Sequence, residues 1–522
     1  TTVRLEDGAG LLTWRFPRVH GGFVWEWRDH GLTHRTSGRP GGDVEFFAYG
    51  GDFDEPLHDG SFITDGMVLS DGTPSPGLAE WAAVVAAVRL VVRGLGDAAR
   101  GDDPDATTQG PRLEVVNRRH SASTADLALT WRVERDGEVV AEGDLVAPVV
   151  AAGTTGTVEL PDPAAAAGPT PAGSEDWLTV EASLAAATAW ADAGHVVSRT
   201  QVDVSAPAAR VAAPAPAGEP VVVEDGAVRV GDAVLDLTTG RLRSVGGTAV
   251  DGPWLELFRA PTDNDRGGTP HAYEDVDPAL TQGAGDDALP SAERWTRLGL
   301  DRLQHRVTGV EVDERAVVVR VRAGIARSDL GVGVTYRWSA GADGAAELAV
   351  SLVPTGPWTG TWPRVGVRLD LPSSVDRAAW FGTGPAESYA DSDHAAVVGA
   401  FATSVDDLVV AYARPQESGH RPDLRWLQLT SSGGAEGGPG LHVTSLADRP
   451  GETRVGFTAR RWTPQELAAA AHDHELPPSD RVVLHLDAAQ HGLGSRACGP
   501  DVLPQHQLAP SARSFRVALR AV

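Results

Sequence analysis

Short runs in which apolar and polar residues alternate fill almost all of residues 221–522. Alternation with a period of two is typical of strands with one buried face, and helical periodicity is confined here to residues 464–471. About 300 residues of strand are too many for one ordinary sandwich, so we predict two packed sheets of many strands. The clearest runs lie at residues 227–230, 317–322, 366–371 and 482–486.

A second all-β segment covers residues 113–204. Its alternating runs are separated by turn signals at intervals that are typical of an immunoglobulin-like β-sandwich. A Gly/Asp-rich stretch at residues 94–112 precedes it, and an Ala/Pro-rich stretch at residues 206–220 follows it, so we interpret both as linkers. The runs lie at residues 113–116, 127–133, 138–141 and 178–182.

The first 93 residues differ from the rest. Residues 23–25 follow two glycines and are predicted to form a buried strand. Residues 76–93 are predicted to form the clearest helix of the chain, because Pro76 stands at its start, Glu80 in its first turn and arginines near its end. A strand followed by a loop and a helix indicates a βα unit of a parallel α/β fold.

Composition excludes several classes of protein. The length of 522 residues is typical of about three domains. The net charge of -26 argues against nucleic acid or an anionic membrane as partner. No apolar run reaches the roughly 18 residues of a membrane span, and we find no leader sequence. The single cysteine, Cys498, excludes an intrachain disulfide and fits a reducing, cytoplasmic location.

Several motifs, in order and at consistent spacing, resemble those of the long bacterial β-galactosidases of glycoside hydrolase family 2. Such a series is far more specific than a lone short pattern, and the match extends over residues 11–522. The motifs are residues 21–32 (GGFVWEWRDHGL), 49–53 (YGGDF), 62–76 (FITDGMVLSDGTPSP), 258–267 (FRAPTDNDRG), 362–366 (WPRVG), 381–389 (FGTGPAESY) and 412–419 (YARPQESG).

The resemblance implies a mainly β chain of three parts. Residues 1–93 correspond to the C-terminal part of a TIM barrel, a (β/α)8 fold. Residues 94–208 correspond to an immunoglobulin-like β-sandwich. Residues 209–522 correspond to a large antiparallel β-supersandwich of the β-galactosidase small-chain type.

The resemblance also implies retaining hydrolysis of terminal β-D-galactosides such as lactose, by two glutamates about 5 Å apart. In the family both glutamates, and the residues that hold Mg, come from earlier barrel strands. The nucleophile lies in a C-E-Y-A-H-A-M-G-N run that this sequence lacks, although residues 7–10 are similar to its end. We therefore expect the chain to carry no catalytic residue and to be inactive alone.

Six acidic residues are candidates, on composition alone, to replace the missing pair. In the family three of them, Glu26, Asp29 and Asp52, are structural. About two barrel strands cannot close into a barrel, so they would hold a new catalytic pair poorly. We therefore disfavour a replacement. The six are Glu26, Asp29, Asp52, Asp54, Glu55 and Asp65.

Three residues match substrate-binding positions of the family. Trp25 corresponds to the tryptophan at the floor of the galactose site, where an aromatic face packs on the sugar. Phe62 corresponds to a phenylalanine whose carbonyl binds Na and whose ring moves with substrate. Asp65 corresponds to a side-chain ligand of that Na, which also contacts the sugar. Without the family, Trp25 and Phe62 would be read as core, and Asp65, before Gly66, as a turn residue.

Cys498 departs from the family pattern. It falls where many relatives have a tryptophan that stacks on the second sugar of lactose, so we expect weaker aglycone binding in the parent enzyme. The alternative is that Cys498 is simply a small buried residue. Residues 263–268 match a loop that reaches the active site in relatives, although they also read as a surface turn.

Three hypotheses follow for the whole chain. It is the C-terminal portion of a β-galactosidase, active only with a missing N-terminal half and commonly oligomeric in relatives. A split enzyme with that half as a separate chain is a variant. Alternatively it is a non-catalytic carbohydrate-binding or scaffold protein, or a hydrolase with unrecognised carboxylates. The only methionine is Met67, so the chain lacks an initiating residue and we favour the first hypothesis.

Overall fold

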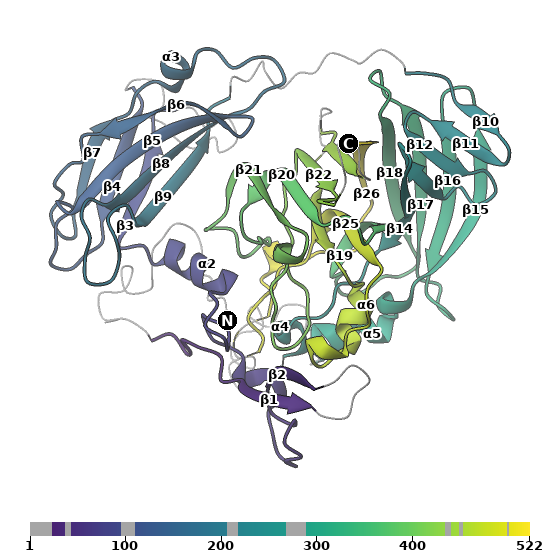
Figure 1. Ribbon diagram of the computed structural model, residues 1–522, viewed down its shortest axis with the longest axis horizontal. Coiled ribbons are helices and arrows are strands. Elements are labelled where there is room, and N and C mark those ends of the chain that lie inside the picture. The colour runs from purple at the N-terminus through teal and green to yellow at the C-terminus, as the bar shows by residue number, and fades with distance from the viewer. Residues whose placement is uncertain are drawn as a thin grey trace.

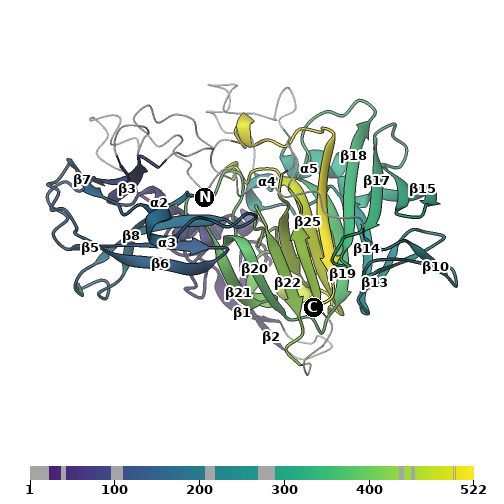
Figure 2. The same ribbon diagram turned by 90° about the horizontal axis from the view of Figure 1, so that it is seen from above.

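The computed structural model describes residues 23–36, 43–95, 110–205, 218–267, 289–433, 440–447, 453–497, 499 and 501–522. Three parts follow one another: an N-terminal segment, a small β-sandwich and a large β domain (Figures 1 and 2). In Figure 1 the small sandwich and the large domain lie on opposite sides of the molecule. In the described parts of the chain, no helix is long and apolar enough to cross a membrane.

Two large antiparallel sheets form the C-terminal domain, which confirms the prediction from the alternating runs. In spatial order the eight-stranded sheet contains β10 (Val222–Glu224), β11 (Ala227–Val230), β12 (Ala233–Asp236), β13 (Leu242–Val245), β14 (Thr248–Glu256), β19 (Arg364–Pro372), β25 (Arg481–Gln490) and β24 (Gly456–Arg460). The nine-stranded sheet contains β15 (Gln304–Val312), β16 (Val317–Gly324), β17 (Gly331–Ala340), β18 (Ala346–Thr355), β26 (Arg513–Arg520), β23 (Leu441–Ser445), β22 (Trp426–Thr430), β20 (Arg377–Gly384) and β21 (Val397–Ser404).

The two large sheets share one apolar core. Strand β16 shows why the sequence folds this way: Val317, Val319, Val321 and Ala323 are buried, while the arginines between them are exposed. Alternating faces of a strand point to opposite sides of its sheet, so the pattern directs one face inward. Four fully buried tryptophans belong to the same core: Trp295, Trp338, Trp362 and Trp380.

Short helices lie between the strands of this domain. Those of the α type are α4 (Asp263–Arg266), α5 (Ser291–Leu298) and α6 (Pro464–Ala469). Those of the 3-10 type are η3 (Leu300–Arg302), η4 (Asp406–Leu408), η5 (Asp473–Glu475) and η6 (Pro504–His506). The sequence predicted α6, whereas it gave no sign of α5, because eight residues are too few to establish a helical period.

The small sandwich also matches its prediction. One sheet has three strands, β3 (Val88–Arg93), β4 (Arg112–Asn117) and β7 (Thr155–Glu159). The other has four, in the order β6 (Glu138–Leu145), β5 (Leu127–Arg135), β8 (Asp176–Leu184) and β9 (Val196–Asp203). A short helix, α3 (Pro163–Ala167), follows β7. Buried residues from both sheets form a second, separate core.

The predicted helix at residues 76–93 is wrong in its second half. The helix α2 (Pro76–Val84) ends before residue 85, and residues 88–93 form β3, which pairs antiparallel with β4. The segment reads VRLVVR, which also alternates, and its Val88 and Leu90 are buried in the core of the small sandwich. Pairing with β4 and burial in that core favour a strand over a helix for this segment.

The buried strand predicted at residues 23–25 is also wrong. Phe23 is fully exposed, Trp25 is 77% exposed, and neither lies in a strand. The pairing around them differs from a parallel βα unit, because β1 (Leu32–Thr36) and β2 (Val44–Ala48) form an antiparallel hairpin. Parallel pairing in the described part of this segment is limited to one bridge between Arg28 and Val68.

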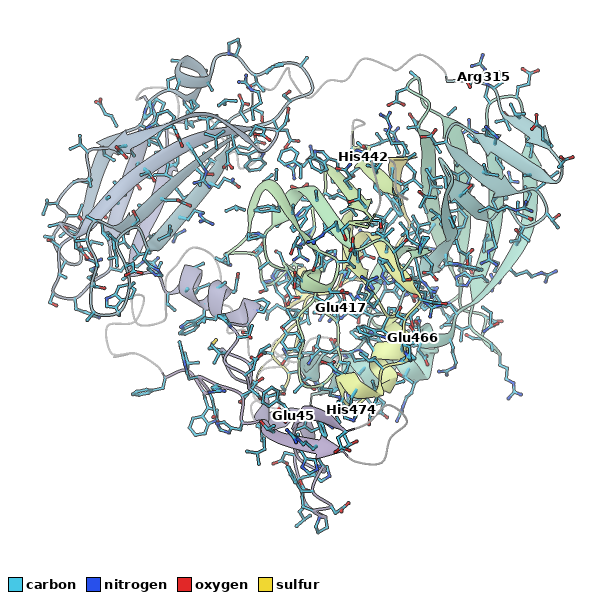
Figure 3. The ribbon with its side chains drawn as sticks, in the orientation of Figure 1. Glu45, Arg315, Glu417, His442, Glu466 and His474 are labelled. Atoms are coloured by element: carbon cyan, nitrogen blue, oxygen red, sulfur yellow. The ribbon has the colours of Figure 1, made fainter. Side chains whose placement is uncertain are left out.

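The N-terminal segment is bonded to the large domain at residues far apart in the sequence. The Tyr49 hydroxyl donates to the carbonyl of Ala471 (2.6 Å), and Nε2 of His472 lies 2.9 Å from Oδ1 of Asp52. At the same junction Glu45 of β2 and His474 line one surface depression (Figure 3). These contacts fix the segment against the end of the large domain.

A buried ion pair holds α4 in place. Arg259 and Asp265 are 0% and 2% exposed, and the Arg259 guanidinium donates to both carboxylate oxygens of Asp265. Arg259 also donates to the carbonyls of His491 (2.6 Å) and Gly492 (2.9 Å). The Asp265 carboxylate in turn accepts from the backbone and hydroxyl of Thr262 and so begins the helix.

We predict that Asp265→Asn destabilises the large domain by about 3 kcal/mol, because it leaves the Arg259 charge buried without its counter-ion. Urea unfolding followed by tryptophan fluorescence measures the change. The control is Glu293→Gln, which breaks an ion pair on α5 with Arg297 whose partners are 46% and 63% exposed. It should cost less than about 0.5 kcal/mol. Equal effects of the two substitutions would contradict a constraining role for the buried pair.

Candidate functional site

A pocket lies between the N-terminal segment and the large domain. One wall includes Asp29, Phe62 and Asp65, and residues 75–77 at the start of α2. The opposite wall comes from loops of the large domain that are several hundred residues away in the sequence. It includes Asp263, Asn264, Glu387, Ser392, Tyr412, Gln416, Glu417 and Leu493.

The four residues singled out from the sequence divide into three cases. Phe62 and Asp65 both line the pocket. Trp25 is largely exposed on the surface of the N-terminal segment. Cys498 lies outside the described residues. The pocket therefore brings together two of the predicted residues.

A short 3-10 helix, η1 (Gly60–Ile63), positions Phe62. The backbone N–H of Phe62 donates to the carbonyl of Asp59 (3.2 Å), and the N–H of Thr64 closes the next turn onto Ser61 (2.9 Å). Phe62 remains 45% exposed. A ring of this size, held by its backbone yet not packed in a core, can present an apolar face to a ligand.

Asp29 supports the turn that carries Asp65. Its buried carboxylate accepts the backbone N–H of Gly66 at 2.8 Å. A Cβ on Gly66 would lie 2.2 Å from the backbone nitrogen of Asp29, so only glycine fits there. Burial raises the pKa of Asp29 to about 6, although the Gly66 hydrogen bond opposes the rise. Burial also raises the pKa of Asp65, and the charge of Glu26 adds to that rise.

Helix α4 connects the two walls of the pocket. The Ser61 hydroxyl donates to Oδ1 of Asp263 (2.8 Å), directly beside Phe62. The Asp263 backbone donates to Gln416 (3.1 Å), whose amide returns a bond to Oδ2 of Asp263 (3.3 Å). Arg414 lies near the same carboxylate at 3.8 Å. The wall with Phe62 is thus bonded to the large domain through one aspartate.

The neighbouring residue of α4 supports a further segment. The Asn264 side chain donates to the carbonyl of Gly494 (3.0 Å) and accepts from the N–H of Ala497 (3.2 Å). Leu493 and Ala497 of this segment line the pocket. These bonds fix the stretch that leads to residue 498, which the sequence associates with the second sugar.

Two glutamates of the large domain reach the pocket in opposite electrostatic environments. Burial raises the pKa of Glu387 to about 7, against a hydrogen bond from the Gly419 N–H. Burial alone would also raise the pKa of Glu417, but Arg460 and Arg364 hold it at about 2. Oε1 of Glu417 lies 2.8 Å from Arg460, and the residue is 2% exposed inside the domain (Figure 3).

Separated pKa values are typical of acid/base pairs, yet this pair does not suit retaining hydrolysis. A nucleophilic carboxylate must reach the sugar, whereas Glu417 is ion-paired to buried arginines. Acidic residues of the N-terminal segment also have structural partners. Asp52 accepts from the N–H of Tyr49, Glu55 accepts from the N–H groups of Gly51 and Phe53, and Glu26 pairs with His30.

Sequence reasoning associated residues 263–268 with the site, and Asp263 and Asn264 of this run do line the pocket, but it missed the other large-domain residues, such as Glu387 and Gln416. Asp263, Asn264 and Gln416 stand in motifs that carry the resemblance, at residues 258–267 and 412–419. Their position in these motifs could have identified them as candidate site residues. Which of their side chains face the N-terminal segment depends on docking, which sequence spacing does not encode.

Comparison with known proteins gives a consistent result along the chain. Residues 231–519 match the family described as "Beta galactosidase small chain". Residues 113–205 match "Beta-galactosidase, domain 4", and residues 10–90 match "Glycosyl hydrolases family 2, TIM barrel domain".

Two curated relatives illustrate the similarity. A β-galactosidase from Arthrobacter sp. is 45% identical over 511 residues, which are 97% of this chain and 47% of that protein. A β-galactosidase from Aeromonas hydrophila is 30% identical, over 97% of this chain and 45% of that protein. The chain thus spans about half the length of the curated relatives it matches. A solved galactose mutarotase-like protein from Lactobacillus casei reaches a TM-score of only 0.30 at 9% identity, covering 58% of this chain and 99% of that one.

We predict that Glu387 makes the large domain less stable as pH rises from about 4.5 to about 7. The folded state keeps the proton over this window, with a pKa of about 7 against an ordinary 4.5, while the unfolded state loses it. Stability falls with pH wherever the folded state binds more protons. Relative to wild type, Glu387→Gln should gain about 1 to 3 kcal/mol across the window, measured by urea unfolding at several pH values. Glu314→Gln, at an exposed glutamate, should gain nothing. If the difference in unfolding free energy between Glu387→Gln and wild type did not change with pH, the Glu387 carboxyl would not hold a proton in the folded state.

Proposed function

Because the chain belongs to the β-galactosidase family within glycoside hydrolase family 2, we propose that it forms the C-terminal half of an enzyme that hydrolyses terminal β-D-galactosides such as lactose. The observation that carries this proposal is the pocket in which Phe62 and Asp65 meet the loops of the large domain. Both residues match the sugar-binding positions of the family. The pocket has aromatic and acidic walls, as a site for a neutral sugar requires.

In this proposal the catalytic glutamates are supplied by barrel strands that precede this sequence in the relatives. A retaining pair needs one carboxylate that attacks the sugar and one that protonates the leaving group, about 5 Å apart. Two carboxylates of the described pocket are instead committed to structural bonds, Asp29 to Gly66 and Glu417 to Arg460. The part played by this chain is to bind and orient the sugar.

Exposed aromatic residues support a missing partner. Phe23, Trp25 and Trp27 are 101%, 77% and 64% exposed on one short stretch, and Leu57 nearby in the sequence is 90% exposed. Large apolar side chains gathered this way mark a surface that another part covers. The barrel half that the relatives possess is the partner we propose. Once covered, the Trp25 ring would form the floor of the galactose site.

A sodium ion fits the Phe62 side of the pocket. Asp65 offers a carboxylate there, and the charges of Glu26 and Asp29 around it favour a cation. Oxygen donors are what a hard cation prefers. We propose that the Phe62 carbonyl and the Asp65 carboxylate hold Na, which supplies positive charge for a sugar hydroxyl. We assign Mg to the barrel half that precedes this sequence in the relatives. We assign Cys498 to the site of the second sugar, where we expect weaker aglycone binding.

Three further attributes belong to this proposal. The enzyme acts in the cytoplasm, which fits a single cysteine and the absence of disulfides. It assembles as a homo-oligomer, as its relatives commonly do. It binds neither nucleic acid nor membrane, in keeping with a net charge of -26.

We predict that the 522-residue chain alone does not hydrolyse a chromogenic β-galactoside above the blank, with Na and Mg present. The full-length polypeptide that includes the barrel half should hydrolyse it, because the two glutamates are then available. Release of the chromophore is the measurement. Robust turnover by the chain alone, lost in Asp65→Ala or Glu26→Gln, would sink the proposal that the catalytic pair lies elsewhere.

We also predict that Asp65→Ala in the full-length polypeptide raises the Na concentration for half-maximal activity by roughly tenfold or more, a loss of about 1.4 kcal/mol in binding. The physical reason is the removal of a charged oxygen ligand. Steady-state rates across a Na titration measure it. Asp71→Ala is the control, since this carboxylate bonds its own turn through Thr73. An unchanged Na requirement in Asp65→Ala would remove this residue from the sodium site.

A further inference from the structure

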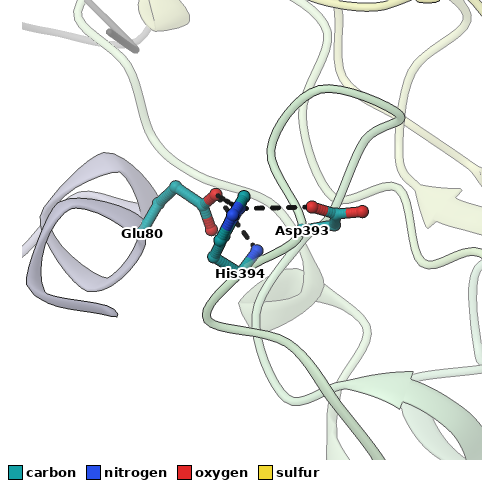
Figure 4. Close-up of side chains that lie close together, drawn as sticks. All are labelled: Glu80, Asp393 and His394. Atoms are coloured by element: carbon teal, nitrogen blue, oxygen red, sulfur yellow. Dashed lines mark hydrogen bonds and ion pairs between the residues drawn. The ribbon is translucent and has the colours of Figure 1, made fainter. Parts of the chain in front are cut away.

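Three metal-ligating side chains meet where helix α2 contacts the large domain. They are Glu80 of α2 and the adjacent residues Asp393 and His394 (Figure 4). Nδ1 of His394 lies 3.0 Å from Oε1 of Glu80 and 3.4 Å from Oδ1 of Asp393. Within the described parts of the chain, this is the one group of three such residues whose ligand atoms all lie within 4.8 Å of one another.

We propose that Glu80, Asp393 and His394 form a structural site for a divalent transition-metal ion, Zn²⁺ or Mn²⁺. The proposal uses none of the residues assigned to Na, and it stands whether or not the proposed hydrolase activity is correct. One imidazole and two carboxylates form a mixed set: imidazole suits zinc and its neighbours, and carboxylates suit manganese. The described protein atoms supply three ligands, and water would complete the coordination.

The separations of the ligand atoms fit a shared ion. Two ligands about 2.1 Å from one ion, at angles of about 90° to 110°, lie about 3.0 to 3.4 Å apart. The two distances from Nδ1 of His394 are 3.0 and 3.4 Å. A proton on the imidazole also satisfies these distances, so an ion would replace that proton. With the proton, one imidazolium and two carboxylates have a net charge of -1. With the divalent ion in its place, the imidazole is neutral and the ion balances both carboxylates, so the net charge is zero.

The ligands are held in place by bonds behind them. The Glu80 side chain is only 7% exposed, and its two oxygens accept the backbone N–H groups of His394 (3.1 Å) and Ala395 (3.0 Å). The loop itself is braced by Asp391, whose carboxylate accepts from the N–H groups of Leu493 (2.8 Å) and Gly494 (2.9 Å). Such supporting bonds orient metal ligands and are needed for affinity. Asp393 is more than half exposed, which leaves a side open to water.

The site lies directly behind the pocket, so an ion bound there would affect how the pocket walls are held together. Residues 75–77, at the start of α2, line the pocket, and so does Ser392, the neighbour of Asp393. An ion between Glu80 and His394 would join two pocket walls that are 314 residues apart in the sequence. It would therefore hold the N-terminal segment against the large domain, one layer behind the pocket.

Cobalt titration of the metal-stripped 522-residue chain tests the proposal. Co²⁺ serves as the spectroscopic probe, and Zn²⁺ and Mn²⁺ are then added as competitors. We expect ligand-field bands that saturate at one equivalent and disappear when either competitor is added in excess. Saturation should also raise the Tm of the chain. These readouts need no substitution, so failure of a variant to fold cannot mask the result.

Matched variants locate the site. Glu80→Gln keeps the shape and an acceptor for one of the two N–H groups, and His394→Gln removes the imidazole; each should abolish the saturable bands and the Tm rise. His472→Gln is the control, because it removes an imidazole–carboxylate pair at the same junction which, among the described residues, belongs to no group of three possible ligands within 4.8 Å of one another. It should retain both signals. Absence of saturable bands in the wild-type chain, or bands that survive Glu80→Gln and His394→Gln, would show that a proton alone holds this cluster.

Discussion

The buried pair of Arg259 and Asp265 is the interaction on which the pocket depends. A buried ion pair adds little net stability, because desolvation of both charges offsets their attraction, but it tolerates only one geometry. That geometry fixes α4, in which the two side chains before Asp265 then have defined targets: Asp263 reaches the turn of Phe62, and Asn264 reaches the segment before residue 498. Displacing the four residues of α4 would therefore disturb both the wall with Phe62 and the segment before residue 498, as well as the part of the lining that α4 itself forms.

The pKa of each pocket carboxylate depends on its burial and on how close it lies to positively charged side chains. Glu417 sits among arginines whose charges hold its pKa near 2, so it stays ionised and structural. Glu387 is buried with weaker compensation, and its pKa rises to about 7. Among the described residues no arginine forms an ion pair with Asp65, and burial raises its pKa. Of these three carboxylates, Asp65 is the one that stands beside Phe62 on the N-terminal wall of the pocket, where we propose the sodium ion.

How far the sequence predicts the structure depends on whether the deciding contacts are local. The strands of the large domain were predictable, because one apolar face in contact with a core imposes alternation on each strand by itself. Residues 88–93 were not, because VRLVVR fits a helix end or a strand, and only pairing with β4 decides between them. Phe62, Asp65 and the run that begins at Asp263 came from motifs, whereas the place of Gln416 beside Asp263 depends on the docking of distant segments. The apolar run at residues 23–25 was predicted to be a buried strand, but Phe23 and Trp25 are largely exposed, because an apolar run by itself does not specify what covers it.

The junction of the N-terminal segment with the large domain links structure to function. Its bonds at Asp52, Ser61 and Glu80 are polar, and each joins side chains that water could otherwise solvate, so each contributes on the order of 1 kcal/mol. The segment meanwhile exposes Phe23 and Trp25, whose burial would contribute several times more. The polar bonds therefore set where the segment sits, while the larger apolar gain remains for a partner. A pocket built this way has its geometry from the large domain, and the barrel half that we propose as partner would add stability by covering the aromatic surface.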